Sequence, residues 1–332
     1  MLVAADLLPE DAAERHGRLR GYFCDKDATA TRTLEGWALE LAWPSDPERH
    51  VDTALDEGLA WWGGDLRRQE MATARRRSSR LLRCLYDSWT LASWAEWLER
   101  SGSGALEHVT ILHVDDHRDL DAPRLSVGAD GWRDLISGAA CDLNDPRSVM
   151  AAIESGAIGM GSFMTPFLAA APQAEVRHLI QPPKGQRTLD FEIRHGVVGD
   201  DLIEPGAPRP AVELVPTGAG TGPRRYRMTP SLDDWLSDLD GRRLLLHVDM
   251  DYFCNRYDGD SDWRSRVLPL DPPMEAIERR VDEVVAALNK RGLIGRLEDI
   301  VVAYSPGFFP AEFWGRTDER LTRGLGLDAG RG

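Results

Sequence analysis

Two short motifs in this 332-residue chain combine aspartate and histidine in a way that could bind a metal. One lies at residues 113–119 and the other at 247–251, and in each the candidate ligands alternate, so an extended backbone would turn them to one face. Carboxylates gathered there repel one another and resist burial unless a cation neutralises them, so the motifs predict a divalent metal. Carboxylate with imidazole suits manganese or zinc. The candidate metal ligands are Asp115, His117, Asp119, Asp249 and Asp251.

Each motif directly follows an apolar run that is typical of a buried parallel strand, at residues 109–112 and 244–246. In open α/β sheets, ligands bind at the edge where such strands end. His113 and His247 each precede the first aspartate of a motif by two residues, so we expect them to lie deeper on the same face and to orient the carboxylates. One such motif alone could equally be a solvated turn or a helix cap, because Asp favours both roles. Two matched motifs after two apolar runs favour the metal.

The rest of the chain alternates between helical and strand-like patterns, which predicts an α/β fold with three layers: a mostly parallel sheet flanked by helices. We expect an N-terminal extension or subdomain at residues 1–80, a catalytic domain at 81–322 and a flexible tail at 323–332. The expected elements are a solvated helix face at 75–77, helices at 81–98, 146–155 and 274–288, strands at 176–180, 189–193 and 300–304, and a Pro/Gly-rich loop at 204–223.

Composition limits the function further. With 42% hydrophobic residues and no long apolar run, the chain is expected to be globular and cytoplasmic, without a membrane partner. Its four cysteines lie far apart, which predicts reduced thiols. The formal net charge of −15 argues against nucleic acid as a partner and favours a cationic substrate such as a basic peptide.

The motifs also resemble those of a known family. The D-x-H-x-D pattern, followed at a distance by D-x-D, is similar to that of the arginase and histone-deacetylase fold. Four segments, at residues 111–117, 161–166, 248–253 and 304–308, resemble the family that includes the peptide arginases, and the likeness covers the region from 80 to 320. It implies an arginase/deacetylase-like fold and a hydrolase that converts arginine in a ribosomally made precursor peptide to ornithine, releasing urea.

The resemblance also implies roles for single residues around two Mn²⁺ ions. Asp115 and Asp249 would contact both ions, and the three remaining candidates one ion each. Arginases supply a further histidine from a preceding segment, which here is residues 86–91 and contains no histidine. Trp89 stands at that position, with Asp87 as a possible substitute. A carboxylate must also face the guanidinium, and Glu312 is the candidate catalytic residue, although a glutamate at a helix start is the ordinary interpretation.

Two other classes of function remain open. A single Zn²⁺ held by Asp115, His117 and Asp251 would suit a deacylase of the same fold. A peptide-binding protein without catalysis would result if the incomplete ligand set held no reactive water. The number of bound metals distinguishes the three: two manganese ions favour guanidine hydrolysis, one zinc ion favours deacylation, and none favours binding alone.

Overall fold

A nine-stranded mixed sheet forms the centre of the computed structural model, which describes residues 1–45, 50–259, 262–266 and 270–327. Its strands are β4 (Arg75–Ser78), β5 (Leu81–Cys84), β6 (Val109–Val114), β10 (Glu175–Leu179), β11 (Leu189–Gly199), β12 (Pro208–Thr217), β13 (Arg225–Thr229), β14 (Arg243–Asp249) and β15 (Leu297–Ala303). They lie in the order β12-β11-β13-β10-β6-β14-β15-β5-β4. The strands from β13 to β5 are parallel, while β11, β12 and β4 pair antiparallel at the edges. The predicted α/β class is therefore confirmed.

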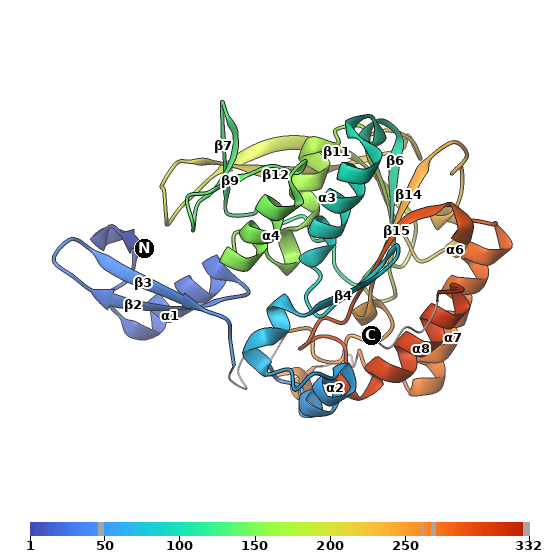
Figure 1. The fold of residues 1–332 in the computed structure, drawn as a ribbon, viewed down its shortest axis with the longest axis horizontal. Coiled ribbons are helices and arrows are strands. Elements are labelled where there is room, and N and C mark those ends of the chain that lie inside the picture. The colour runs from blue at the N-terminus through green and yellow to red at the C-terminus, as the bar shows by residue number, and fades with distance from the viewer. Residues whose placement is uncertain (46–49, 260–261, 267–269, 328–332) are drawn as a thin grey trace.

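Helices cover both sides of this sheet, as Figure 1 shows, with α3 and α4 on one side and α6, α7 and α8 on the other. The helices are α3 (Trp89–Ser101), α4 (Pro146–Ser155), α5 (Met164–Ala170), α6 (Leu232–Trp235), α7 (Met274–Lys290) and α8 (Trp314–Gly324). The carboxylate of Asp145 caps α4 by accepting from the Arg147 N–H, and Gly156 ends it with a φ of 90°. Helix α7 buries a stripe that includes Ile277, Val281 and Leu288.

The two strands that precede the acidic motifs are neighbours. All residues of β6 are buried, as are all but the first of β14. Because both faces of the sheet are covered, apolar residues predominate in both strands, which is the pattern predicted for a parallel core. The two strands run in register, with Val248 opposite Val114. The motifs therefore leave the sheet side by side at the same edge.

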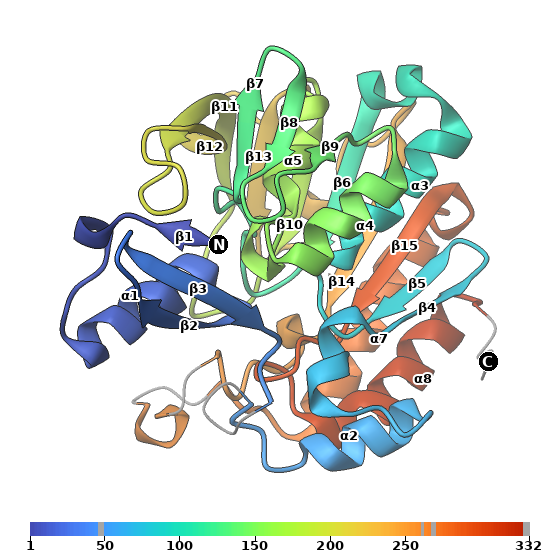
Figure 2. The ribbon, with the colours of Figure 1, turned by 60° about the vertical axis from the view of Figure 1, so that its left-hand side comes forward.

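The N-terminal residues form a separate lobe beside the sheet (Figure 2). The lobe consists of β1 (Leu2–Val3), α1 (Ala12–Phe23), β2 (Asp27–Arg32) and β3 (Trp37–Ala42), with the strands in the order β1-β3-β2. Its small core includes Leu19, Phe23 and Trp37, and Leu202 from the segment between β11 and β12 packs into it. Helix α2 (Leu55–Trp62) instead packs into the main core, and a third sheet contains β7 (Leu125–Gly128), β8 (Gly131–Asp134) and β9 (Ala140–Cys141).

Several expected elements are corrected. Residues 75–77 form strand β4 rather than a helix face, because alternate arginines turn toward the sheet. Residues 81–84 are a strand buried on both faces, so they lack the period of the helix that was expected from 81. The expected loop at 204–223 contains the ten-residue strand β12, an edge position that tolerates proline. Of the expected tail, residues up to 324 belong to α8, while 328–332 lie outside the described residues.

Two other sequence expectations concern the whole chain. None of the four cysteines, all of which lie in the described part of the chain, forms a disulfide. Within the described ranges, no helix combines the length and the apolar character that crossing a membrane requires.

Candidate metal centre

The two acidic motifs meet where β6 and β14 end. His113 on β6 lies opposite His247 on β14, so the residues that follow each histidine leave the sheet together. The backbone N–H of Asp116 donates to a carboxylate oxygen of Asp251 at 3.1 Å, which ties the two loops together. The parallel register thus brings side chains more than 130 positions apart to one place, as the sequence predicted.

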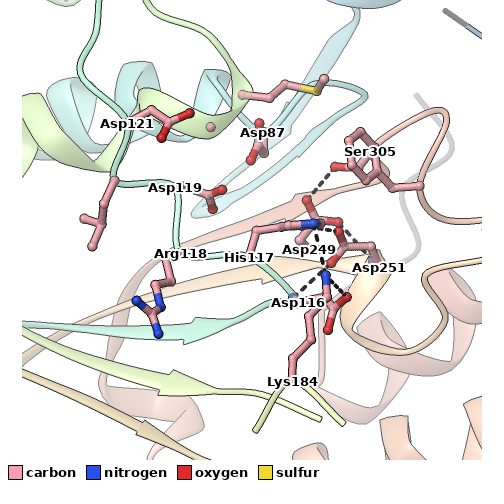
Figure 3. A pocket seen from close by; sticks show the side chains of 14 residues that line it. Asp87, Asp116, His117, Arg118, Asp119, Asp121, Lys184, Asp249, Asp251 and Ser305 are labelled. Atoms are coloured by element: carbon pink, nitrogen blue, oxygen red, sulfur yellow. Dashed lines mark hydrogen bonds and ion pairs between the residues drawn. The ribbon is translucent and has the colours of Figure 1, made fainter. Parts of the chain in front are cut away.

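A cavity of about 520 Å³ opens at this edge of the sheet (Figure 3). Among the described residues that line it, six are aspartates and two, Arg118 and Lys184, are lysine or arginine. The lining residues are Asp87, Asp116, His117, Arg118, Asp119, Leu120, Asp121, Met160, Gly161, Lys184, Asp249, Asp251, Ser305 and Phe308. The cavity is therefore predominantly acidic.

Four overlapping groups of side chains around this cavity could each hold a metal ion, because their ligand atoms lie within 4.8 Å of one another. Asp115 belongs to three of them, so it is the centre of the arrangement. The groups are Asp115, His117 and Asp251; Asp87, Asp115 and Asp249; His113, Asp115, Asp119 and His247; and Asp116, His117 and Asp258.

His117 is held at both ring nitrogens. Its Nδ1 lies 2.9 Å from a carboxylate oxygen of Asp251, and its Nε2 lies 3.1 Å from Asp258. A carboxylate on the far nitrogen of a histidine fixes the ring and leaves the near nitrogen to face a metal. The arrangement therefore fits His117 as a ligand through Nδ1, with Asp258 as the residue that orients it.

Asp87 enters the site from a third segment. It lies between β5 and α3, is 3% exposed, and groups with Asp115 and Asp249. Trp89 faces the core instead: its indole N–H donates to the carbonyl of Ala72 at 2.7 Å. Two residues were considered for the missing ligand position. Asp87 lines the cavity, whereas Trp89 packs into the core.

Four buried carboxylate oxygens have no hydrogen-bond partner among the described residues: Oδ1 of Asp87 and the Oδ2 atoms of Asp115, Asp119 and Asp251, the last of which faces the His117 ring as an ion pair. Burial, followed by repulsion from neighbouring carboxylates, raises the pKa of Asp87, Asp119 and Asp249 well above the usual range. Buried oxygens without donors are costly to keep ionised. A divalent cation would relieve both problems, so the residues present fit a metal.

Burial also dominates at the other two predicted ligands. It raises the pKa of Asp115 and of Asp251 to about 6. Burial alone would lower the pKa of His117, but the carboxylate of Asp251 and the further acids around the ring outweigh it and raise that pKa. A metal on Nδ1 would take the place of that proton.

His113 and His247 form a hydrogen-bonded pair behind the carboxylates. Burial lowers the pKa of His113 well below the usual value and that of His247 to about 3, so both rings are neutral. Nε2 of His113 lies 3.0 Å from the carbonyl oxygen of His117, which can only accept, so that nitrogen carries the proton. Its Nδ1 then accepts from Nδ1 of His247, also at 3.0 Å. Nε2 of His113 lies 3.7 Å from Asp119, and to bind a metal it would have to give up its bond to His117.

A third histidine completes a row across three neighbouring strands. His178 on β10 lies opposite His113. Its Nε2 donates to the carbonyl of Asp115 at 3.0 Å, while its Nδ1 accepts from the hydroxyl of Tyr226 at 2.8 Å. Burial lowers its pKa to about 3. The row of rings thus fixes the backbone from which the candidate ligands project.

The remaining predicted residues differ in their surroundings. Both oxygens of Asp249 are engaged, one by the N–H of Asp251 and the other by the hydroxyl of Ser305. Glu312 forms an ion pair with Arg256, and the described residues that line the cavity do not include it. Its assignment as the catalytic carboxylate gains no support from this position.

Three residues in and beside the cavity were not predicted from the sequence: Lys184, Asn255 and Asp258. Lys184 follows β10 and pairs with Asp116 at 2.7 Å. Asn255 donates to Asp116 at 2.7 Å and to Asp258 at 2.9 Å. All three lie in loops, where no periodic pattern marks the side chains that turn inward. The nearest signal was the position of Asp258 and Asn255 shortly after the second motif.

Comparison with known proteins adds no assignment. No protein-family model matches the chain, and no curated protein is significantly similar to it.

Proposed function

We propose that this chain is a metal-dependent hydrolase that acts on the guanidinium group of arginine within a polypeptide, leaving ornithine and releasing urea. The observation that carries the proposal is the group of buried carboxylates at the ends of β6 and β14, with four oxygens that lack a hydrogen-bond partner among the described residues. Their strand-end position also agrees with the sequence resemblance to the arginase and deacetylase fold. Two bound Mn²⁺ ions would supply a nucleophilic hydroxide at neutral pH.

The ligand sets favour manganese over zinc. The group of Asp87, Asp115 and Asp249 offers only oxygen, which suits a hard cation. The group of Asp115, His117 and Asp251 adds one imidazole and suits either metal. Because Asp115 belongs to both groups, two ions would share it. With Asp87 as the substitute for the histidine of arginases, the second ion would have the three carboxylates of Asp87, Asp115 and Asp249 as ligands.

The residues around the ligands have separate tasks. Asp258 orients His117, and Ser305 orients Asp249 by donating to its carboxylate. Lys184 neutralises Asp116, which would otherwise add to the repulsion among the ligands. The remaining negative charge attracts a cationic side chain. A guanidinium is such a group, and an acylated lysine is not.

The shape of the site favours a polypeptide over free arginine. A second cavity of about 160 Å³ shares Asp116 and Asp251 with the main one. A third, of about 270 Å³, shares Met160 and Phe308 with it. Residues on both sides of a central arginine could therefore contact the protein. Binding energy from such remote contacts can be used at the reacting centre.

The direct test is to incubate the Mn²⁺-loaded protein with arginine-containing peptides. Each modified residue should lose about 42 Da and release one urea, the stoichiometry of removing the amidino group by hydrolysis. Free arginine should be a poor substrate because the remote contacts are missing. If arginine peptides stay unchanged while an acetyl-lysine peptide is hydrolysed, the proposal fails.

The variant Asp87→Asn provides the matched metal test. It removes one charged ligand of the all-oxygen group and leaves the group of Asp115, His117 and Asp251 intact. Bound manganese should fall from two ions to one, and urea release should fall with it. Unchanged metal content would exclude Asp87 as a ligand.

A mononuclear deacylase is the second candidate. It is supported by the compact group of Asp115, His117 and Asp251, which alone could hold one ion with an open position. In that case the wild-type protein should bind one Zn²⁺, and Asp87→Asn should change neither the stoichiometry nor the activity.

A further inference from the structure

The cavity contains one carboxylate that belongs to none of the metal-binding groups. Asp121 lines the cavity together with five other aspartates. Four of those five belong to groups that include Asp115, and Asp116 is paired with Lys184. Asp121 is exposed, and its side chain has no hydrogen-bond or ion-pair partner among the described residues. Its charge is therefore free for a ligand.

The position of Asp121 is fixed by the backbone. It follows Asp119 by two residues, and its N–H donates to the carbonyl of Gly161 at 2.9 Å. A Cβ atom at position 161 would lie 3.2 Å from a carboxylate oxygen of Asp121, so glycine leaves this side of the carboxylate open. In Figure 3, Asp121 lies beyond Asp119, on the side of the cavity away from Asp249.

Neither basic residue of the cavity wall neutralises Asp121. Lys184 is shared between Asp116 and Asp258, at 2.7 and 3.2 Å. Arg118 points away from the ligands in Figure 3, and its guanidinium lies 5.7 Å from the ring of Phe191. The uncompensated charge at the wall thus lies next to the candidate metal ligands but separate from them.

We propose that Asp121 determines specificity by binding the cationic end of the substrate side chain. This inference rests on the proposed function and names the group that makes the site select a cation, a role for which the sequence had suggested Glu312. A carboxylate can accept two parallel N–H bonds from a guanidinium, which fixes the plane of that group as well as its place. Phe308 and Met160 provide the apolar part of the wall along which the side-chain stem could lie.

The test separates binding from turnover by using labelled peptides with a central lysine or norleucine. Lysine keeps the positive charge but has no guanidine to hydrolyse. Fluorescence anisotropy should show that the Mn²⁺-loaded wild-type chain binds the lysine peptide about 10- to 100-fold more tightly than the norleucine peptide, the range expected for one charge-assisted contact. Asp121→Asn should remove this preference and raise KM for an arginine peptide more than it lowers kcat, with bound manganese unchanged.

Asp130→Asn is the matched control. It removes the same charge from an exposed turn between β7 and β8, and the preference for lysine should remain. If Asp121→Asn keeps the preference while the wild type hydrolyses arginine peptides, the role of Asp121 is refuted and the proposed function stands. Loss of manganese from Asp121→Asn would refute it too, by making the residue part of the metal site. If the wild type neither prefers the cation nor releases urea, both proposals fail.

Discussion

Buried acids occur in two regions of the main core, and their partners differ. Asp299 on β15 is fully buried, and an Arg77 nitrogen lies 2.9 Å from its carboxylate. Asp318 on α8 is paired with Arg83 at 2.8 Å and also accepts from the hydroxyl of Tyr304. At the ends of β6 and β14, buried carboxylates instead face one another without an arginine. The structural acids are thus paired with arginine, whereas the candidate ligands Asp87, Asp119 and Asp249 have no arginine or lysine partner among the described residues, and there we propose that a metal binds.

The largest expected effect is the loss of metal from Asp115→Asn. Asp115 belongs to three of the four candidate groups, so its replacement should weaken manganese binding by more than about 100-fold, beyond the 10- to 100-fold typical of residues behind the ligands. Metal analysis of the purified variant measures this. Asp299→Asn serves as the control, since that acid has its own arginine, and it should keep its manganese. Wild-type metal content in Asp115→Asn would contradict the central role of that residue.

A substitution at the acids that are paired with arginine should change the stability of the fold rather than the binding of metal. Arg83→Met leaves Asp318 as a buried charge without its guanidinium, so the free energy of unfolding should fall by about 3–5 kcal/mol. Urea denaturation of the metal-free protein measures it. Asp119→Asn in the same assay should be neutral or stabilising, because it removes a carboxylate that repels its neighbours. If both variants lost a similar amount of stability, the proposed difference between the arginine-paired acids and the candidate metal ligands would be contradicted.

The stability of the metal-free protein should depend on pH through the ligand cluster. The pKa of Asp115 and of Asp251 is about 6 in the folded chain, against about 3.9 for an unperturbed aspartate. Because the folded value is higher, protonation favours the folded state: the stabilisation is complete below about pH 4 and is lost as the pH rises through 6. In that window, each of the two aspartates should lower the free energy of unfolding by about 1.4 kcal/mol per pH unit.

Thermal unfolding between pH 4.5 and 7, with and without Mn²⁺, checks this dependence. Manganese should raise the midpoint more at pH 7 than at pH 5, because it binds the ionised carboxylates. A metal-free protein that becomes steadily more stable up to pH 7 would contradict the burial of unneutralised charge at this edge.

The smallest effect is expected behind the ligands. His113→Ala should weaken manganese binding about 10- to 100-fold without abolishing it, because the ring holds His247 and the backbone of His117 rather than the metal. Isothermal titration with Mn²⁺ measures the change. Complete loss of binding with an intact fold would make His113 a ligand and would favour the group that it forms with Asp115, Asp119 and His247.

The sequence predicted the part of the site that depends on local pattern. An apolar strand followed by alternating acids predicts candidate ligands at a sheet edge, and both strands, β6 and β14, are found where expected. Asp258 could not be predicted in this way. Its contact with His117 joins positions 141 residues apart and depends on the path of a loop. Glu312 shows the same limit, because nothing near it in the sequence indicates its pairing with Arg256, 56 positions earlier.

The fold shows a similar division. The helix at α4 was predictable because its cap, its proline and its terminal glycine lie within twelve residues of one another. Strand β12 was not, because proline and glycine normally indicate a loop. Whether a proline-containing segment can be a strand depends on whether it lies at an edge, and that is decided by the arrangement of the whole sheet.

The prolines of β12 also limit how the sheet can interact with other chains. Pro208, Pro210 and Pro216 are separated by even numbers of residues, so their backbone nitrogens lie on the same side of β12. Because proline has no N–H to donate to β11, these residues occupy the positions at which the N–H would point outward. At that outer side only Val212 and Leu214 keep a donor. The opposite edge, β4, carries three consecutive arginines. Neither edge invites another strand, which disfavours aggregation through the sheet and leaves the strand ends as the place for an extended peptide to bind.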